Sequence, residues 1–205
     1  GPTRAVRCRL VGAELQFSES AIGEDAMKRS IPSTRGFLLD SPDGALLVAD
    51  YSNGHFYPLN ETPFRRSAMS GGSTLDMPWI GILDMTSGGG YAVIFDSPDD
   101  VNINMAKIDL ATGCTHVPQL SWAARKGQFG PDARSYRFYF TDRGGYVDLA
   151  KHWRGIAKNT GYLVTLKEKA TRNPNVHKLM GAADIWGGGS LSFAQEAKAH
   201  GIDKL

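Results

Sequence analysis

A chain of 205 residues, with 41% hydrophobic residues, 24 glycines and 10 prolines, is long enough to bury one core and too apolar to be disordered. It has no run of the roughly 18–20 apolar residues that a membrane-spanning helix needs, and its formal net charge of +2 is too small to indicate a polyanionic partner. We therefore expect neither a nucleic acid nor a membrane as partner. Because Gly1-Pro2 resembles a cleavage scar, the native N-terminus is expected to have been trimmed, and the compartment stays open.

Short apolar segments separated by turn residues predict antiparallel strands along the first 143 residues. The expected strands are 4–11, 14–18, 37–39, 45–49, 78–83, 91–95, 101–105, 117–123 and 136–140. Residues 37–39 are expected to pair with 45–49 across a Pro-Asp-Gly turn, and a slip in the alternation before Ile108 predicts a β-bulge. Residues 21–34 are irregular, which favours a loop with a helical turn. The fold class is thus mainly β, with an antiparallel β-sandwich spanning residues 1–143.

Residues 144–205 follow a different pattern. Apolar residues from Tyr146 to Ala157 recur at helical spacing, and Gly161 stands where a left-handed residue would end the helix. An apolar run at 179–186, a triple glycine and a second helix follow, for which Ser192-Phe-Ala-Gln195 is the expected capping box and Gly201 the C-cap. The order of strand, loop and helix is typical of a β/α repeat. These residues are therefore predicted to form a second domain, an α/β segment that begins a (β/α)8 barrel with its first strand at 179–185.

Cysteine, histidine and acidic residues give no clear cofactor site. Cys8 and Cys114 are too far apart in sequence for a metal knuckle, and two buried free thiols are favoured over a disulfide. The five histidines lack metal-ligand spacing and are expected to be ordinary surface or half-buried residues. The acidic residues of the segment 95–100 are compatible with Ca²⁺, although a turn between strands explains them at lower cost. No cofactor is therefore expected.

The segment LDMPWIG at 75–81 is a candidate binding site. Its proline fixes the backbone before Trp79, and Met77 is an adaptable neighbour. Indole faces stack on the apolar side of sugar rings, which is a physical reason to place Trp79 at a carbohydrate site. The alternative, that Trp79 belongs to the sandwich core, stays open.

The segment ADIW at 183–186 is the stronger candidate. If 179–185 is the first barrel strand, Asp184 and Trp186 lie at its C-terminal end, where barrel active sites are built. A carboxylate there accepts hydrogen bonds from vicinal sugar hydroxyls while the indole stacks on the ring. An Asp184 that only caps the following loop is the structural alternative.

Five motifs follow one another along the chain: LDMPWIG (75–81), YAVIFDSPDD (91–100), GGYVDLAKHWR (144–154), LKEK (166–169) and GAADIW (181–186). In this order they resemble the N-terminal part of bacterial glycoside hydrolases similar to families 129 and 101, the α-N-acetylgalactosaminidases. The resemblance implies a large, galactose-mutarotase-like β-sandwich followed by a (β/α)8 barrel, and retaining hydrolysis with two carboxylates. In that family the nucleophile and the acid/base lie on later barrel strands, beyond Leu205. Asp184 would then be a sugar-hydroxyl ligand, with Trp186, Trp79 and Met77 as weaker candidates for the pocket wall.

The resulting hypothesis is the N-terminal portion of a glycoside hydrolase for α-linked N-acetylgalactosaminyl or related glycans. Its partners would be carbohydrate and the missing barrel portion, and residues 1–205 alone are expected to be inactive. The sugar and the compartment (secreted, periplasmic or cytoplasmic) stay open. The alternative is a non-catalytic carbohydrate-binding or assembly module built on the sandwich.

Overall fold

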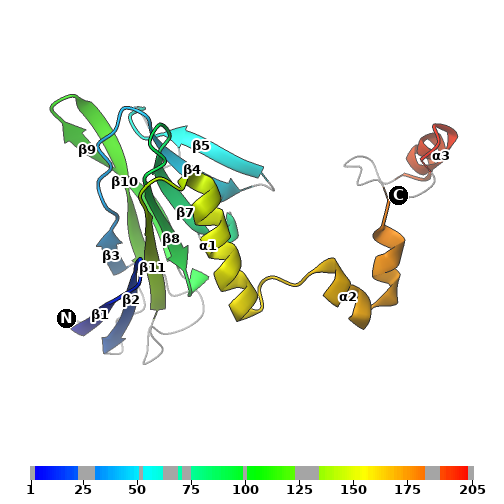
Figure 1. Cartoon of the computed structure of the whole chain (residues 1–205), viewed down its shortest axis with the longest axis horizontal. Coiled ribbons are helices and arrows are strands. Elements are labelled where there is room, and N and C mark those ends of the chain that lie inside the picture. The colour runs from blue at the N-terminus through cyan, green and yellow to red at the C-terminus, as the bar shows by residue number, and fades with distance from the viewer. Residues whose placement is uncertain are drawn as a thin grey trace. The chain divides into compact units, whose positions relative to one another are not determined.

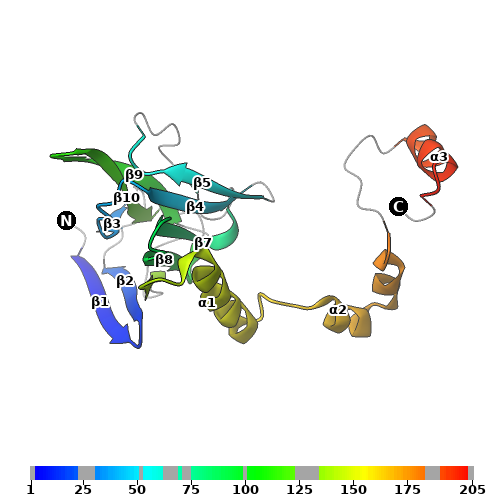
Figure 2. The same cartoon turned by 45° about the horizontal axis from the view of Figure 1, so that its top comes forward.

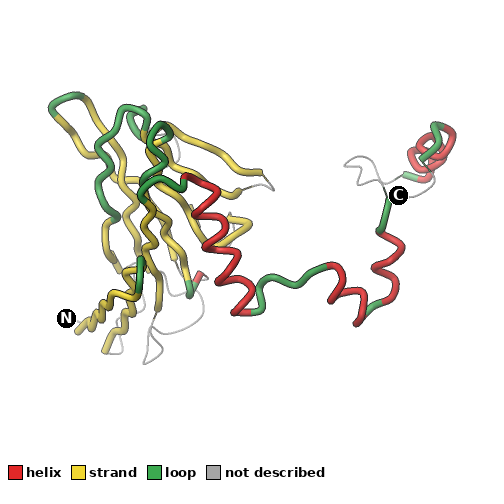
Figure 3. The backbone as a smooth tube through the Cα atoms, viewed as in Figure 1, coloured by secondary structure: helices red, strands yellow, loops and turns green. Residues whose placement is uncertain are grey.

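The computed structural model describes residues 3–22, 31–50, 53–61, 69–70, 75–98, 101–122, 134–182 and 190–202. Strands dominate up to Thr141, and helices follow from Gly145, as Figure 3 shows. The mainly β, antiparallel architecture expected from the sequence is thereby confirmed. The chain forms two compact units, Gly1–Trp153 and Arg154–Leu205.

The first unit contains two antiparallel sheets (Figure 1). The larger sheet has the strand order β1-β2-β11-β8-β7-β4-β5, and the smaller has the order β3-β10-β9-β6. In chain order the strands are β1 (Thr3–Val11), β2 (Glu14–Ile22), β3 (Ile31–Arg35), β4 (Gly44–Asp50), β5 (Asn53–Pro58), β6 (Met69–Ser70), β7 (Leu75–Asp84), β8 (Gly90–Phe95), β9 (Val101–Leu110), β10 (Gly113–Trp122) and β11 (Arg134–Thr141). Since β2 pairs with β11 and β3 with β10, strands far apart in the sequence join in both sheets.

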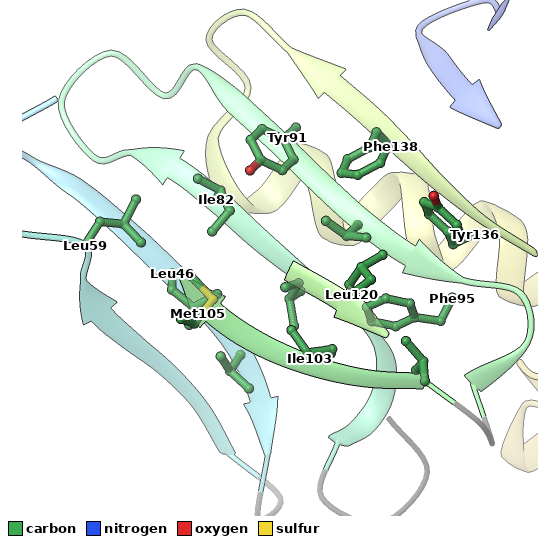
Figure 4. Close-up of a cluster of buried hydrophobic side chains, with 14 of the residues drawn as sticks. Leu46, Leu59, Ile82, Tyr91, Phe95, Ile103, Met105, Leu120, Tyr136 and Phe138 are labelled. Carbon is green, nitrogen blue, oxygen red and sulfur yellow. The ribbon is translucent and has the colours of Figure 1, made fainter. Parts of the chain in front are cut away.

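The hydrophobic core lies between the two sheets (Figure 4). Its labelled side chains include Leu46, Ile82, Tyr91, Phe95, Tyr136 and Phe138 from the larger sheet and Ile103, Met105 and Leu120 from the smaller one. Strand β11 shows why the sequence folds this way, because Tyr136 and Phe138 are fully buried while Arg137 between them points to the other face. Burying each such large side chain contributes about 1.5–3 kcal/mol of hydrophobic stabilisation.

The opposite face of the larger sheet, called the outer face below, carries the first part of helix α1 (Gly145–Thr160), which runs beside β7 and β8 (Figure 2). Gly81 of β7 permits the close approach, since a Cβ there would stand 3.0 Å from Leu149 Cδ1 and 3.3 Å from Leu47 Cβ. Leu149 and Trp153 of the helix are buried. With both faces covered, β7 contains an unbroken run of buried residues at 79–83 instead of an alternating pattern.

The triple glycine at 88–90 joins β7 to β8 and also receives the start of α1. Gly88 has a φ of +75°, and its carbonyl accepts the N–H of Gly145 at 2.9 Å. A Cβ on Gly88 would stand 2.8 Å from the carbonyl oxygen of Arg143. The hairpin predicted at this segment is confirmed, and its glycines also allow the turn to lie against the helix start.

The second unit holds the end of α1, helix α2 (Leu166–Arg172), the 3₁₀ helix η2 (Pro174–Leu179) and helix α3 (Leu191–Ala199). Local hydrogen bonds define these helices. Thr165 and Glu168 form a reciprocal capping box, and the Ser190 hydroxyl accepts the N–H of Phe193 at 3.2 Å. Neither α2 nor η2 contains a buried residue, so caps and turns, not a core, hold them in shape.

The predicted pairing of residues 37–39 with 45–49 is wrong. Residues 36–43 instead connect β3 to β4. Strand β3 lies largely within the segment expected to be a loop, and β4 pairs with β5 and β7. Phe37 packs edge-on against Phe138 and Phe140, each with 5.1 Å between ring centroids, and the Tyr91 hydroxyl donates to the Phe37 carbonyl at 2.7 Å. Aromatic packing therefore fixes this apolar segment without a strand partner.

The predicted β-bulge near Ile108 is also wrong. Strand β9 pairs with β10 in one continuous register from Val101 to Leu110. The alternation slips because β9 extends past the core, so Lys107 and Asp109 occupy positions that would otherwise point inward and form an exposed ion pair at 2.7 Å.

Four smaller differences concern single positions. Cys8 and Cys114 form no disulfide, as expected, but Cys8 is exposed on β1 and Cys114 is half-buried, so the predicted burial is wrong. Helix α3 is capped by Ser190, two residues before the predicted Ser192, because the helix begins earlier. Leu179 ends η2 and a turn follows, so the barrel strand expected from 179 does not begin there, and residues 183–185 lie outside the described residues. His116 is buried, although a surface or half-buried histidine was expected. Its Nδ1 lies 2.8 Å from the Leu59 carbonyl, a polar partner that allows the burial.

Candidate functional site

Met77 and Trp79 lie together on the outer face of the larger sheet. Strand alternation places both side chains opposite Ile80 and Ile82, which belong to the core between the sheets. They line a pocket of about 500 Å³ together with Leu47 and Ala49 of β4 and Tyr146 and Ala150 of α1. With Gly54 of β5 also in its lining, the pocket is built from three strands of the larger sheet and the start of the helix that covers it.

Trp79 is covered, whereas Met77 and Tyr146 in the same pocket are open. Its side chain is 3% exposed, while Met77 is 39% and Tyr146 50% exposed. A sugar ring stacks on an indole only where a face of the indole is accessible, so Met77 and Tyr146 are better placed than Trp79 to touch a ligand. Phe56, whose ring centroid lies 5.7 Å from that of Tyr146, adds a second exposed aromatic group near the pocket.

The Trp79 indole N–H is buried and has no hydrogen-bond partner in the described part of the chain. Leaving a buried donor unpaired costs about 1–3 kcal/mol, so this group needs an explanation other than core packing alone.

Asp184 and Trp186, the stronger candidates from the sequence, fall outside the described residues. Their side chains therefore have no described geometry, and their role stays a prediction.

A charged network that the sequence did not reveal occupies another part of the outer face. Its central group is the Glu14 carboxylate on β2, which is 8% exposed. Arg137 of β11 donates to it at 3.1 Å and binds Asp96, just after β8, with two hydrogen bonds of 2.8 and 3.2 Å. His152 Nε2 lies 2.6 Å from the other Glu14 oxygen. One carboxylate thus links the sheet to the helix.

Two side chains of helix α1, one turn apart, contact Tyr139 of the sheet. The ring of His152 stacks on that of Tyr139, with centroids 3.6 Å apart and planes inclined by 3°. Asp148 accepts a hydrogen bond of 2.9 Å from the Tyr139 hydroxyl. Positions i and i+4 face the same way on a helix, so both contacts stabilise one orientation of α1 on the sheet. His152 is half-buried, as expected, but it also connects the helix to Glu14 and Tyr139 of the sheet.

The pKa directions show what this network can do chemically. Burial by itself would raise the pKa of Glu14, but hydrogen bonds from Gln16 and His152 and the charge of Arg137 outweigh it and hold the pKa below its usual value. Burial and the hydrogen bond to Asp148 raise the pKa of Tyr139. A glycosidic general acid needs a carboxyl group that keeps its proton. Glu14 instead favours the ionised form, and as an anion it holds helix α1 to the sheet through His152.

A second buried carboxylate, Glu19, lies between the sheets at the edge of the core. It accepts hydrogen bonds of 2.9 Å from the Trp122 indole and the Tyr136 hydroxyl, and another from Ser33. Burial, the largest effect, raises the pKa of Tyr136 to about 12. Because Glu19 is fully buried and several donors satisfy it, this cluster stabilises the sandwich and offers no access to a substrate.

Within the described ranges, no group of three or more His, Cys, Asp or Glu side chains is placed to hold a metal ion. Asp96, the first acidic residue of the segment considered for Ca²⁺, is bound to Arg137, and residues 99 and 100 lie outside the described part. No described helix is long and apolar enough to cross a membrane.

Part of this arrangement was accessible from the sequence. The alternation of Tyr136, Phe138 and Phe140 assigns Arg137 and Tyr139 to the outer face. The pairing of β2 with β11 that brings Glu14 beside them joins segments more than a hundred residues apart, and no local pattern indicates it.

No family model matches the chain, and no curated protein matches it. Comparison with solved structures shows that the fold described here also occurs as part of a glycoside hydrolase. That enzyme is the α-N-acetylgalactosaminidase NagBb from Bifidobacterium bifidum. Its GalNAc complex matches with a TM-score of 0.68 and 16% identity over 97% of this chain and 40% of the NagBb chain. The ligand-free form gives 0.61 and 15% over 96% and 40%, and the quadruple mutant 0.61 and 16% over 86% and 34%.

This chain therefore spans at most 40% of the length of the NagBb chains that it matches. The resemblance to a part of such a hydrolase, predicted from the five motifs, is confirmed at the level of the fold. At 16% identity the likeness concerns the fold alone.

Proposed function

We propose that this chain is the N-terminal portion of a glycoside hydrolase that acts on α-linked N-acetylgalactosaminyl or related glycans. The observation that carries the proposal is the structural match to NagBb over 97% of this chain, with a TM-score of 0.68. The sandwich, of galactose-mutarotase-like type, would support and wall an active site that the remaining polypeptide completes. The match to only 40% of the NagBb chain supports a division of labour in which catalysis lies outside residues 1–205.

The charges of the described carboxylates support this division. The carboxyl groups of Glu14, Asp84 and Glu168 have displaced pKa values, and all three are shifted downward by hydrogen bonds from their neighbours. Retaining hydrolysis needs one carboxyl group held protonated about 5–5.5 Å from a second that is ionised. None of these three carboxylates fits the protonated group, and the proposal places the nucleophile and the acid/base outside residues 1–205.

The second unit would begin the (β/α)8 barrel. Its α2 and η2 helices bury none of their residues, and Leu166, Leu179 and Met180 are at least 55% exposed. Leu166 and Met180 also line an apolar hollow of about 370 Å³ on the same helices. Apolar surface of this kind is stabilised when another layer covers it, and the rest of the barrel is the layer that the proposal supplies.

Asp184 is proposed as a ligand for sugar hydroxyls, with Trp186, Trp79 and Met77 as walls of the pocket. The test uses the longer gene product that contains this chain and an aryl α-N-acetylgalactosaminide as substrate. Asp184→Ala should lower kcat/KM by about 10²-fold or more, because a hydrogen bond to a charged partner is lost in the transition state. Asp184→Asn should recover part of the loss. Asp142→Ala, at an exposed carboxylate in the turn before α1, is the matched control.

Unchanged kinetics in Asp184→Ala would remove this residue from the site. Absence of any turnover by the folded longer protein, across α-linked N-acetylgalactosaminyl and galactosyl substrates, would contradict the proposed function itself.

A further inference from the structure

Strand β1 forms one edge of the larger sheet (Figure 1). It pairs with β2 along its whole length, from Thr3 opposite Ile22 to Val11 opposite Glu14. No other described strand pairs with its far side. A nine-residue edge strand of this kind presents a row of backbone donors and acceptors to another extended segment.

The side chains of β1 alternate between cationic and apolar. Arg7 and Arg9 lie on the outer face, because Arg9 is opposite Gln16, which in turn is opposite Arg137. Val6, Cys8 and Leu10 lie on the other face, in line with the core residues of β2 and β11. The apolar row is open, with Val6 47% and Leu10 71% exposed. The edge thus has one basic face and one uncovered apolar face.

The two arginines carry charge that no described carboxylate balances. Arg9 Nε donates to the neutral amide of Gln16 at 2.8 Å, and neither Arg7 nor Arg9 forms an ion pair within the described residues. Arg137, on the same face, is in contrast neutralised by Glu14 and Asp96. Side chains two residues apart on a strand stand about 7 Å apart, the spacing of alternate residues on a facing strand.

A hollow of about 980 Å³ runs along this side of the sheet. Arg7, Arg9, Ser18 and Arg137 line it together with Asp96, whose carboxylate is already paired with Arg137. A strand added beside β1 would lay its outer side chains along this basic surface.

We propose that the edge of β1 binds an extended peptide segment, acidic on one face and apolar on the other, by addition of a strand to the larger sheet. Backbone hydrogen bonds would provide affinity, carboxylates would pair with Arg7 and Arg9, and apolar side chains would cover Val6, Cys8 and Leu10. A second copy of this chain fits less well, since antiparallel pairing of two β1 strands would bring their arginines together on one face. An anionic small molecule would use neither the free edge nor the apolar row. The proposal does not depend on the proposed hydrolase function.

The test measures binding of a labelled nine-residue peptide of alternating glutamate and valine to the complete 205-residue chain, by fluorescence anisotropy. Saturable binding is expected. Arg7→Glu combined with Arg9→Glu should weaken it at least about tenfold, because like charges then face each other. Arg143→Glu combined with Arg172→Glu makes the same change of charge at exposed positions outside β1 and should leave binding unchanged. Circular dichroism and the unfolding midpoint verify that each variant is folded.

Two N-methylated peptides separate strand addition from charge attraction. Each carries methyl groups on alternate backbone nitrogens, in opposite phase, so only one of them loses the donors that face β1. Loss of binding by one peptide and retention by the other would support the proposal. Equal binding of both, or of a peptide with the same composition in scrambled order, would contradict it. Absence of binding to every peptide would also contradict the proposal. Sedimentation showing a dimer that the added peptide does not dissociate would contradict it as well, because a second copy would then occupy the edge.

Discussion

The two units of the chain differ in what holds them together. In Gly1–Trp153 two sheets enclose a continuous core in which residues such as Ile80, Val93 and Phe138 are completely buried. In Arg154–Leu205 the helices α2 and η2 bury nothing, and their geometry comes from caps such as the Thr165–Glu168 box. Local signals are therefore enough to define helices, whereas stable packing needs strands from distant parts of the sequence.

Helix α1 shows both kinds of stabilisation. Gly161, with a φ of +80°, follows its end as a local stop signal. Its first turns, by contrast, are attached to the sheet by Leu149 over Gly81 and by the contacts of Asp148 and His152 with Tyr139. Four substitutions test how far this contrast between packed and locally defined structure holds.

The largest effect is expected from the core. Phe138→Ala removes a fully buried ring and should lower the free energy of unfolding by about 3–5 kcal/mol. Leu191→Ala, at a residue of α3 that is 76% exposed, should change it by less than about 0.5 kcal/mol. Urea unfolding followed by tryptophan fluorescence measures both. A similar loss of unfolding free energy in the two variants would contradict the proposed difference between the units.

The next effect concerns the charged network under α1. Glu14→Gln removes the anion that His152 and Arg137 contact and should cost about 2 kcal/mol. Because the pKa of Glu14 is lowered by folding, its contribution is complete above the ordinary value of 4.5 and is lost as pH falls through the lower, folded-state value. The difference in stability between wild type and variant should therefore shrink below pH 4.5. A constant difference from neutral pH to pH 3 would show that Glu14 does not act as an anion here.

A smaller effect is expected where α1 approaches β7. Gly81→Ala places a methyl group 3.0 Å from Leu149 and should destabilise the first unit by about 1–2 kcal/mol as the helix shifts. The control is Gly54→Ala on β5, where a Cβ would meet nothing within 4 Å. Thermal unfolding compares the two. Equal midpoints would mean that α1 is not packed closely on the sheet.

The smallest effect is confined to the second unit. Thr165→Ala removes the capping box of α2 and should cost about 1 kcal/mol of local helix stability. Hydrogen exchange of the α2 amides should rise, while exchange in β7 and β8 stays the same. Increased exchange in those strands as well would indicate that the two units unfold together.

Much of the fold was predictable because its signals are local. Alternating residues such as Tyr136 and Phe138, and turn glycines such as Gly12 and Gly88, indicated strands and hairpins, and helical spacing with Gly161 indicated α1. The strand order was not predictable, since β2 beside β11 and β3 beside β10 depend on contacts between distant segments. Phe37 misled the prediction for the same reason, because its partners Tyr91 and Phe138 lie far along the chain.

The candidate site was predictable only in part. The sequence singled out Met77 and Trp79, and the structure places both on one pocket, but the cover over Trp79 depends on how α1 crosses the sheet. The Glu14 network stayed hidden, because its members lie on strands and a helix that only the tertiary fold joins.

The most direct test of the central claim compares the release of aryl aglycone from an α-N-acetylgalactosaminide by this 205-residue chain and by the longer gene product. No turnover is expected from the chain alone, and clear turnover is expected from the longer protein. Turnover by the chain alone, or none by the folded longer protein, would contradict the claim.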